Sequence, residues 1–450
     1  MGEGGRITLI NEQNRAWILV NESSYQMSHW SFPQRIEAHS YVHVYIEFQQ
    51  KAFKYTCDDS GNAEYEIEGS SERFQVQARA MNGFTLQIEL TNMSTWGSPK
   101  GILKKLGWKH DGYVSFLMTT VDSNITYSSI DDDCPTWMQN SFNMLGDRRL
   151  KRICIPGSHD AGMSCIDNST VFGGIEGLVI TQSESIGGQL YSGARYFDIR
   201  PVIAGGRYKT GHYNNSSGAS DGANGQSIES IISEINQFMK NKRELIVLNL
   251  SHSLNTDLGF GSYRTFNQTE WNGLFSLLSG LEHRFVHTNL NVDLSELTLK
   301  EFISEHSSVV IIVEDDDADR PVGLGAYHGN GFYKYSSFNV YNQYSNTDEF
   351  SVMYRDQLNK MKNFYDNSSI HDKYSMFLLS WTLTPNGPLD KIIGPANNAN
   401  NLLTGYTYPT VKNSSVDPSS RLLYPNIVYI DNVIDGKAAV LSMAINNVLR

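Results

Sequence analysis

The chain has 450 residues, of which 40% are apolar and 19% are charged, and its formal net charge is −12. The length leaves room for two domains, and the composition is that of a folded globular protein rather than of a disordered chain. Because phosphate binding needs clustered cations and the sequence has no Lys/Arg-rich run, we expect no nucleic-acid surface and no docking to anionic membranes by charge alone.

Apolar and polar residues alternate in the N-terminal part, from Ile7 to about Leu117. This period of two is typical of half-buried antiparallel strands. The clearest runs are 41–48, 74–79 and 84–90, and Asn82-Gly83 between the last two predicts a hairpin turn. We therefore predict an all-β sandwich domain over residues 1–125.

The pattern changes after a predicted linker, 126–145, which contains three consecutive aspartates. Two short strands, 153–155 and 196–200, are expected to stop at Pro156-Gly157 and at Pro201. Apolar residues at helical spacing predict a helix over 227–240. Nearly continuous apolar runs at 245–248, 309–313, 376–379 and 427–430 predict strands that are buried on both faces.

Buried strands that alternate with helical stretches indicate an α/β domain with a parallel sheet. For residues 146–450 we predict a TIM-like (β/α) barrel, of which six or seven strands are visible in the sequence. A doubly wound open sheet is the structural alternative. Two long segments, 323–346 and 395–421, are expected to be loops, and the first is either a lid over a site or a surface insertion.

The polar residues that follow the strands of a parallel barrel converge at one mouth. In this chain they are Ser158, His159, Asp160, Asp198, Arg200, His212, Asn249, Ser251, His252, the acidic run 314–317, Asp431 and Asn432. Two histidines can act as general base and general acid when their neighbours hold one neutral and the other protonated. An arginine can clamp a phosphate and offset the charge that develops on its oxygens.

Each of these features also has a structural explanation. A single histidine is usually a satisfied structural residue, Asp198 and Arg200 share one face of a strand as many ion pairs do, and Pro-Gly-Ser is often only a turn. Taken together at the ends of predicted strands, they favour an active site over a structural or degenerate one.

Three segments carry a resemblance to a known family: 155–162 (IPGSHDAG), 186–201 (IGGQLYSGARYFDIRP) and Gly211-His212. They are similar to the catalytic X region of bacterial-type and fungal phosphatidylinositol-specific phospholipases C. The resemblance covers roughly residues 150–433 and is densest in the first third. The N-terminal segment lies outside it and resembles, only distantly, fungal β-sandwich proteins that bind lipid or glycan.

The resemblance implies a role for each matching residue. His159 would take the proton from the 2-hydroxyl of the headgroup, which attacks phosphorus to form a cyclic phosphodiester, and His212 would protonate the departing diacylglycerol oxygen. Arg200 would hold the phosphate. The three aspartates would support this centre: Asp160 would orient His212, Asp431 would orient His159, and Asp198 would help to position the cluster.

Calcium-dependent relatives place an Asn after the first histidine and acidic residues in the second motif, whereas this chain has Asp160 and Arg200. The resemblance therefore implies a mechanism without a metal ion or another cofactor. A metal-dependent diesterase stays as an alternative. The acidic run 314–317 is expected to be a solvated loop, and the other interpretation is that its oxygens bind a hard cation.

The headgroup pocket departs from the family pattern. The bacterial enzymes present a basic residue for inositol after a middle strand, whereas the comparable strand in this chain, 309–313, is followed by four acids. The candidate substrate-binding residues are His252, Trp381 and Arg200. The expected substrate is an inositol phospholipid or a glycosyl-phosphatidylinositol (GPI)-type phosphodiester, and a diester with another headgroup is the close alternative.

Two other classes of function compete with this one. A non-catalytic protein could bind lipid or glycan on the same scaffold, whereas a membrane-inserting toxin is disfavoured because the sandwich lacks a long amphipathic hairpin. The expected partners are a phospholipid substrate and, transiently, a membrane surface. The absence of an apolar signal core favours the cytoplasm or unconventional export. Numerous Asn-x-Ser/Thr acceptors leave the compartment open, and disulfides and oligomeric state are undetermined.

Overall fold

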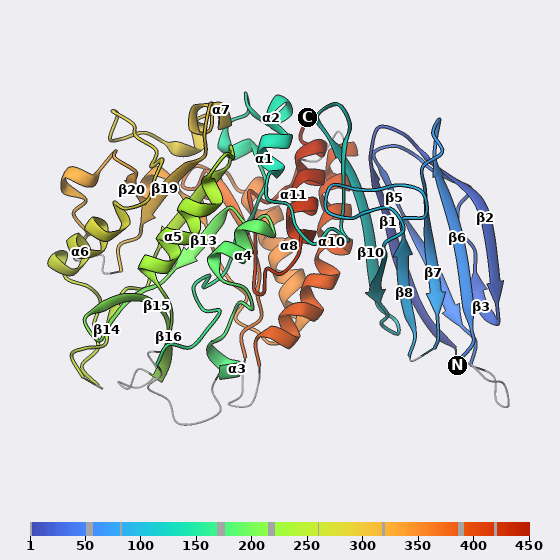
Figure 1. Cartoon of the computed structure of the whole chain (residues 1–450), viewed down its shortest axis with the longest axis horizontal. Coiled ribbons are helices and arrows are strands. Elements are labelled where there is room, and N and C mark those ends of the chain that lie inside the picture. The colour runs from blue at the N-terminus through green and yellow to red at the C-terminus, as the bar shows by residue number, and fades with distance from the viewer. Residues whose placement is uncertain are drawn as a thin grey trace. The chain divides into compact units, whose positions relative to one another are not determined.

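The computed structural model describes residues 2–50, 57–81, 83–168, 176–214, 221–259, 261–316, 320–385, 391–417 and 421–450. The chain folds into two compact units, each described separately below (Figure 1). The first comprises Met1–Cys134, Asn400–Ser420 and Asp435–Arg450, and the second Pro135–Ala399 and Arg421–Ile434.

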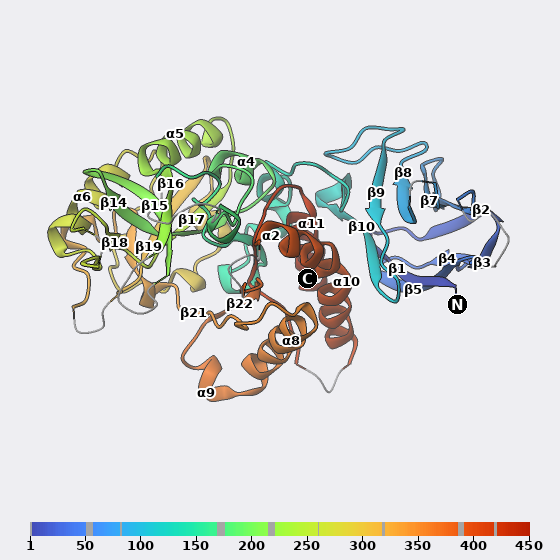
Figure 2. The same cartoon turned by 90° about the horizontal axis from the view of Figure 1, so that it is seen from below.

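Two β-sheets form the bulk of the first unit, and Figure 2 shows them as two layers. Within the described residues, one sheet has the order β11 (Ile125–Ser128), β10 (Tyr113–Val121), β1 (Glu3–Glu12), β5 (Ser40–Phe48), β3 (Met27–Trp30). The other has the order β4 (Arg35–Ile36), β2 (Trp17–Tyr25), β6 (Ser60–Ile67), β7 (Arg73–Arg79), β8 (Thr85–Glu89), β9 (Leu103–Gly107). The pairs are antiparallel except β1 with β10, which is parallel.

The alternating residues of these strands fill the space between the two sheets. Val44, Ile46 and Phe48 of β5 are buried, and so are the alternate residues of β7 and β8. Strands β7 and β8 pair antiparallel, as the hairpin prediction required, although Asn82 of the turn lies outside the described residues. Period-two burial therefore explains why this segment forms a layered β structure.

Two helical segments from the C-terminal part of the chain belong to the first unit. Helix α11 (Lys437–Val448) is buried on nearly all sides and packs against β10, where Asn447 Nδ2 donates to Thr119 Oγ1 over 2.8 Å. In the second half of α10 (Ile393–Val416), Tyr408 donates its hydroxyl hydrogen to the buried Glu12. The sequence placed both segments in the 146–450 domain, because local patterns do not show which distant surface a helix covers.

The second unit is built around a curled parallel sheet. Within the described residues its order is β20 (Phe332–Lys334), β19 (Ser308–Val313), β17 (Leu245–Leu250), β13 (Tyr196–Ile199), β12 (Ile155–Ser158), β23 (Ile427–Ile430), β22 (Met376–Trp381), β21 (Val340–Tyr341). All of these pairs are parallel. No ladder joins β20 to β21 in the described part of the chain, so the sheet is a mixed α/β half-barrel rather than the complete barrel that was expected.

Helices and a small sheet complete the second unit. The helices are α1 (Trp137–Asn140), α2 (Phe142–Leu145), α3 (Glu176–Val179), α4 (Ile186–Tyr191), α5 (Ile228–Met239), α6 (Gln268–Leu278), α7 (Leu299–Phe302), α8 (Phe350–Asp366), α9 (Ser368–His371) and the start of α10. Helix α5 occupies the segment predicted as helical: Ser227 caps it by accepting from Ser230 N, and Ile231 and Ile235 face the core.

The small sheet carries one of the two expected catalytic histidines. Its order is β16 (Asp221–Ser227), β15 (Arg207–Asn214), β14 (Pro201–Ala204), β18 (Leu254–Asn255). Strand β14 starts immediately after β13, so that Arg200 lies at the junction of the two strands. Strand β15 pairs antiparallel with both β14 and β16 and places His212 opposite Ala223.

Several boundaries differ from those expected. The predicted linker 126–145 contains most of β11 and helices α1 and α2. Strand β12 includes Pro156 and Gly157 instead of stopping there, since the Pro156 carbonyl accepts from Arg195 N over 2.9 Å. A Cβ on Gly157 would lie 2.7 Å from a methyl carbon of Ile427, so the close packing of β12 on β23 requires glycine.

Both predicted long loops are partly regular structure. Segment 323–346 contains β20 and β21. Phe332 and Tyr333 of β20 are buried in the sheet, whereas Asn342, Tyr344 and Asn346 line a cavity of this unit. Segment 395–421 contains most of α10, which continues through Pro409. Tertiary packing overrides the local preference of proline in this helix.

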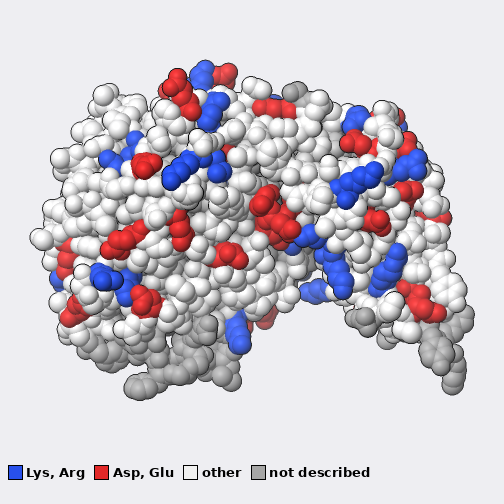
Figure 3. Space-filling model, in the orientation of Figure 1, with Lys and Arg blue, Asp and Glu red and all other residues white. Residues whose placement is uncertain are grey.

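The surface and the remaining sequence features are unexceptional. No helix among the described residues has both the length and the apolarity needed to cross a bilayer. On the face shown in Figure 3, acidic and basic side chains are scattered among uncharged ones. Cys57, Cys134, Cys154 and Cys165 are all unbridged thiols.

Candidate active site

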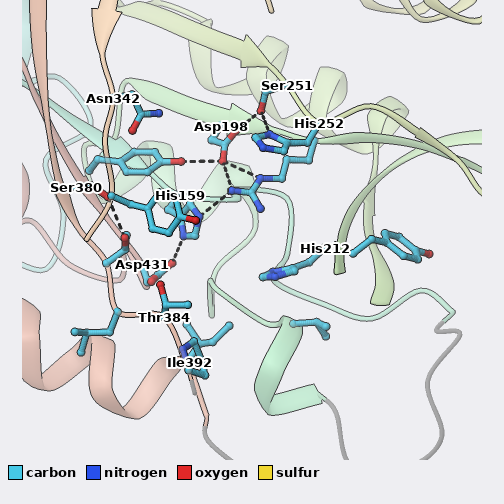
Figure 4. A pocket seen from close by; sticks show the side chains of 18 of the residues that line it. His159, Asp198, His212, Ser251, His252, Asn342, Ser380, Thr384, Ile392 and Asp431 are labelled. Carbon is cyan, nitrogen blue, oxygen red and sulfur yellow. Dashed lines mark hydrogen bonds and ion pairs between the residues drawn. The ribbon is translucent and has the colours of Figure 1, made fainter. Parts of the chain in front are cut away.

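The residues that follow the strands of the half-barrel line a cavity of about 770 Å³ at the carboxyl ends of the strands. His159 follows β12, Arg200 follows β13, and Asp431 follows β23, while His212 comes from the small sheet. Figure 4 shows the imidazole rings of His159 and His212 facing the same space from different strands. The folded chain therefore brings His159, Arg200 and His212, which were predicted as base, clamp and acid, to one cavity.

His159 is held between a carboxylate and a guanidinium. Its Nδ1 lies 2.7 Å from Asp431 Oδ1, and its Nε2 lies 2.9 Å from Arg200 Nη2 (Figure 4). Because a guanidinium only donates hydrogen bonds, Nε2 must be the acceptor, and the imidazole proton is on Nδ1 and points to Asp431. This is the tautomer that a general base needs, although in the structure the lone pair of Nε2 is directed toward Arg200 Nη2.

Burial alone would lower the pKa of His159, but the charge of the Asp431 carboxylate and the hydrogen bond to it raise this pKa by more. The net result is a pKa above the ordinary value of about 6.5 for histidine. The imidazole of His159 therefore becomes neutral only when the pH rises through this elevated pKa.

Arg200 connects the two halves of the cluster. Its Nε donates to Asp198 Oδ2 over 3.0 Å, and its Nη1 lies 3.4 Å from Asp160 Oδ2. Its side chain is mostly buried, with 18% of its surface exposed. Two carboxylates fix the plane of the guanidinium while it still faces the cavity, so Arg200 presents a preoriented positive charge to the cavity.

Asp198 is the centre of a buried hydrogen-bond network. Its carboxylate accepts from Arg200, from the hydroxyl of Tyr429 over 2.8 Å, from Ser251 Oγ over 2.9 Å and from the backbone N–H of Asp160 over 3.1 Å. Burial would raise the pKa of Asp198, but Arg200 and His159 lower it by more, so the carboxyl stays ionised. The network fixes Arg200 in one orientation.

His212 lies close to a carboxylate of its own. Its Nδ1 is 2.9 Å from Asp160 Oδ2, which is an ion-pair distance, although the angles are not those of a hydrogen bond. Asp160 is fully buried, has a positive φ of 41°, and its backbone carbonyl accepts from Thr181 Oγ1 over 2.8 Å. The same Asp160 oxygen therefore faces both Arg200 and His212.

Comparison with known proteins gives matches among solved structures only. No protein-family model and no curated protein matches the chain. A solved phosphatidylinositol-specific phospholipase C from Listeria monocytogenes is 16% identical with a TM-score of 0.48, over 70% of this chain and 98% of that chain. A pentafluoro-Phe form of the enzyme from Staphylococcus aureus is 15% identical with a TM-score of 0.45, over 69% and 97%. At these values the function has to be argued from the site itself.

Of the three substrate-binding candidates, His252 and Arg200 line the cavity and Trp381 does not. His252 has a positive φ of 54°, and its Nδ1 forms a hydrogen bond with Ser251 Oγ over 2.8 Å. Burial of the ring and the positive charge of Arg200 lower the pKa of His252. Trp381 is buried, and its indole N–H donates to Ala399 O over 2.9 Å. Successive strand residues face opposite sides, so Ser380 and Thr382 line the cavity and Trp381 faces α10.

The described members of the acidic run have separate surroundings. Glu314 lines the cavity, Asp315 accepts from Val322 N over 2.7 Å, and Asp316 accepts from Ser253 N over 3.1 Å. Asp317 lies outside the described residues. No group of three or more His, Cys, Asp or Glu side chains arranged to hold a metal ion occurs among the residues described.

Tyr429 lines the cavity and was not among the predicted site residues. It lies in the apolar strand β23, where only its hydroxyl distinguishes it from its neighbours, and its ring also packs on His159 with centroids 5.2 Å apart. The sequence did offer one signal for Tyr429. Its hydroxyl lies in a strand that is otherwise buried and apolar, and a buried polar atom needs a hydrogen-bond partner.

Proposed function

We propose that the chain is a phosphodiesterase that cleaves its substrate by attack of a hydroxyl within the substrate, in the manner of phosphatidylinositol-specific phospholipases C. One observation carries the proposal: two histidines, each next to a different carboxylate, line one cavity together with a buried arginine. Cleavage of a phosphodiester needs a base for the nucleophile, an acid for the leaving group and a cation for the phosphate.

His159 acts first in the proposed reaction. Its Nε2 takes the proton from a headgroup hydroxyl next to the phosphate. The oxygen of this hydroxyl then uses its electron pair to form a new bond to phosphorus. Asp431 stabilises the imidazolium that results, because its carboxylate lies 2.7 Å from Nδ1. The substrate hydroxyl takes the place at Nε2 that the Arg200 N–H occupies in the structure.

Arg200 and His212 complete the reaction. Arg200 donates hydrogen bonds to a non-bridging oxygen, where negative charge increases as the fifth bond to phosphorus forms. The bond from phosphorus to the leaving oxygen then breaks, and protonated His212 transfers its proton to that oxygen. The products are a five-membered cyclic phosphodiester and an alcohol, and the reaction leaves His159 protonated and His212 neutral.

For the substrate we propose an inositol phospholipid or a GPI-type phosphodiester. Both have a hydroxyl on the carbon next to the phosphate ester, as intramolecular attack requires. The cavity of about 770 Å³ has room for a ring headgroup together with its phosphate. We propose further that no metal ion is needed, because Arg200 is a fixed cation at the position where the phosphate charge develops.

Phosphorus NMR of the purified protein with phosphatidylinositol micelles in EDTA tests this proposal. The expected result is a cyclic inositol phosphate signal from the wild type and its loss in His159→Ala and in His212→Ala. His283→Ala is the matched control, since His283 lies outside the cavity and its substitution is expected to leave the signal unchanged.

Each other result points to a different function. A linear phosphate as the first product would contradict intramolecular attack. Activity that is lost in EDTA and restored by a divalent cation would replace the arginine-based mechanism with a metal-dependent one. If no product forms from any headgroup tried, and headgroup binding survives His159→Ala, the chain is a non-catalytic binding protein.

A further inference from the structure

Glu314 occupies a different environment from the acids that follow it. Asp315 and Asp316 each accept a backbone N–H of a neighbouring segment and so have structural partners. Glu314 instead follows β19 directly and lines the cavity that holds His159 and Arg200. It is therefore the member of this run, among the described residues, that a ligand in the cavity can reach.

Asn249 of β17 lies beside Glu314 and has an unused acceptor. Its Nδ2 donates to Glu314 Oε1 over 3.1 Å, while its Oδ1 is buried and has no hydrogen-bond partner. Asn249 is only 3% exposed and also lines the cavity. A buried carbonyl oxygen without a partner is unfavourable, so a ligand that donates a hydrogen bond to Asn249 Oδ1 removes this penalty.

The charged and titratable groups around Glu314 are Asp198, Asp316, Arg200, Tyr196 and Tyr335. Arg200 is the only Lys or Arg among the described residues that line the cavity, and it already faces Asp198 and Asp160. The carboxylate of Glu314 thus lacks a cation of its own. Two acceptors and a surplus of negative charge suit a ligand group that is both a donor and positively charged.

We propose that Glu314 and the Oδ1 atom of Asn249 form a subsite for a protonated amine carried by the headgroup of the substrate. The inference rests on the proposed function, because it assumes that the phosphate occupies the side of the cavity near Arg200. A neutral hydroxyl would also donate to both oxygens. An ammonium is preferred because a hydrogen bond between two charged groups is roughly twice as strong as a neutral one.

Burial raises the pKa of Glu314 to about 7, with a smaller contribution from Asp198, whereas the hydrogen bond from Asn249 lowers it. A bound ammonium stabilises the ionised carboxylate and therefore lowers this pKa. Amine binding near pH 7 is then accompanied by release of a proton from Glu314, and binding of a neutral headgroup is not.

Isothermal titration calorimetry tests the subsite without turnover. The ligands are myo-inositol and a set of amino-deoxy inositols that differ in the position of the amine. At about pH 7.5 we expect at least one amine to bind roughly tenfold more tightly than inositol, with proton release seen as a dependence of the heat on buffer ionisation. Its affinity is expected to fall roughly tenfold at about pH 6, as Glu314 becomes protonated.

Two variants distinguish the effect of Glu314 itself from the effect of the overall negative charge of the region. Glu314→Gln keeps the size of the side chain and is expected to abolish both the amine preference and the proton release. Asp315→Asn removes one negative charge from the exposed neighbour and is expected to change neither. Equal affinity of the wild type for inositol and every amine, or no amine binding at all, overturns the proposal.

The proposed reaction and the proposed amine subsite can be contradicted independently of each other. If phosphatidylinositol is cleaved but no amine is preferred, the reaction stands and the subsite is wrong. If an amine binds through Glu314 but no cyclic phosphate forms from any substrate, the subsite stands and the proposed reaction is wrong.

Discussion

The hydroxyl of Tyr429 donates a hydrogen bond to Asp198 Oδ2 over 2.8 Å, from a strand 231 residues further along the chain. The same carboxylate oxygen accepts from Arg200 Nε. Tyr429 therefore acts on the proposed phosphate site through Asp198 and need not touch the substrate. We regard it as a positioning residue.

Tyr429→Phe removes this donor and keeps the ring that packs on His159. We expect kcat to fall roughly 3- to 10-fold with little change in KM, equivalent to about 1 kcal/mol of lost transition-state stabilisation. Steady-state kinetics on phosphatidylinositol measure both constants. Tyr365→Phe is the control: it removes a buried hydroxyl that donates to Tyr424 O over 2.9 Å, and it is expected to affect stability only.

Asp431→Asn removes the negative charge that raises the pKa of His159, while burial and Arg200, which lower it, remain. His159 must be neutral to act as the base, so kcat/KM rises with pH through this pKa. We expect the acidic limb of the profile to lie above about pH 6.5 in the wild type and to move to lower pH in the variant.

The value of kcat/KM on the high-pH plateau is also expected to fall in Asp431→Asn, by roughly 100-fold, because the His159 imidazole loses its orienting partner. The pH profile of kcat/KM and an NMR titration of the His159 imidazole give the two quantities independently. A limb that stays in place in the variant would show that another group controls the rate at low pH.

The role of His212 as the acid can be tested by changing the leaving group. With a lipid substrate, His212→Ala is expected to lose a factor of roughly 10² to 10⁴, since an alkoxide needs a proton to leave. With a p-nitrophenyl inositol phosphate the leaving group needs no proton, and the loss is expected to be less than about tenfold. His159→Ala should be equally defective with both substrates, and recovery of that variant instead would reverse the two assignments.

Trp381 is expected to contribute to stability rather than to headgroup binding. Trp381→Phe keeps most of the buried ring and loses the hydrogen bond to Ala399 O, so we expect the free energy of unfolding to fall by about 1 kcal/mol. Urea denaturation measures this change. The KM for the lipid is expected to stay the same, and an increase would return Trp381 to the substrate site.

Strands of the second unit could be located from sequence because each is a short apolar run with its own boundaries. Runs 245–248, 309–313, 376–379 and 427–430 all lie within β17, β19, β22 and β23. Strands β20 and β21 were missed because they have only three and two residues, and their pairing depends on the neighbouring strand. The helix through Pro409 was missed because packing outweighs local preference.

The chemistry of the candidate site followed from the identity of the residues at the strand ends. His159, Arg200 and His212 could be named because parallel strands present their following residues at one edge. The partner of each histidine came from the resemblance, and the structure places both carboxylates within 2.9 Å. The tautomer of His159 needed the structure, since it depends on Arg200 being at Nε2.

By itself, the sequence determined what repeats locally: the period-two strands, the buried apolar runs and the motif residues between 155 and 212. Tertiary structure alone decided which residues meet, as when Asp431 reaches His159 across 272 residues and Tyr429 rather than Trp381 enters the site. The reason is physical: periodicity reflects burial of one segment, whereas hydrogen-bond partners and pKa values depend on atoms brought together by the whole sheet.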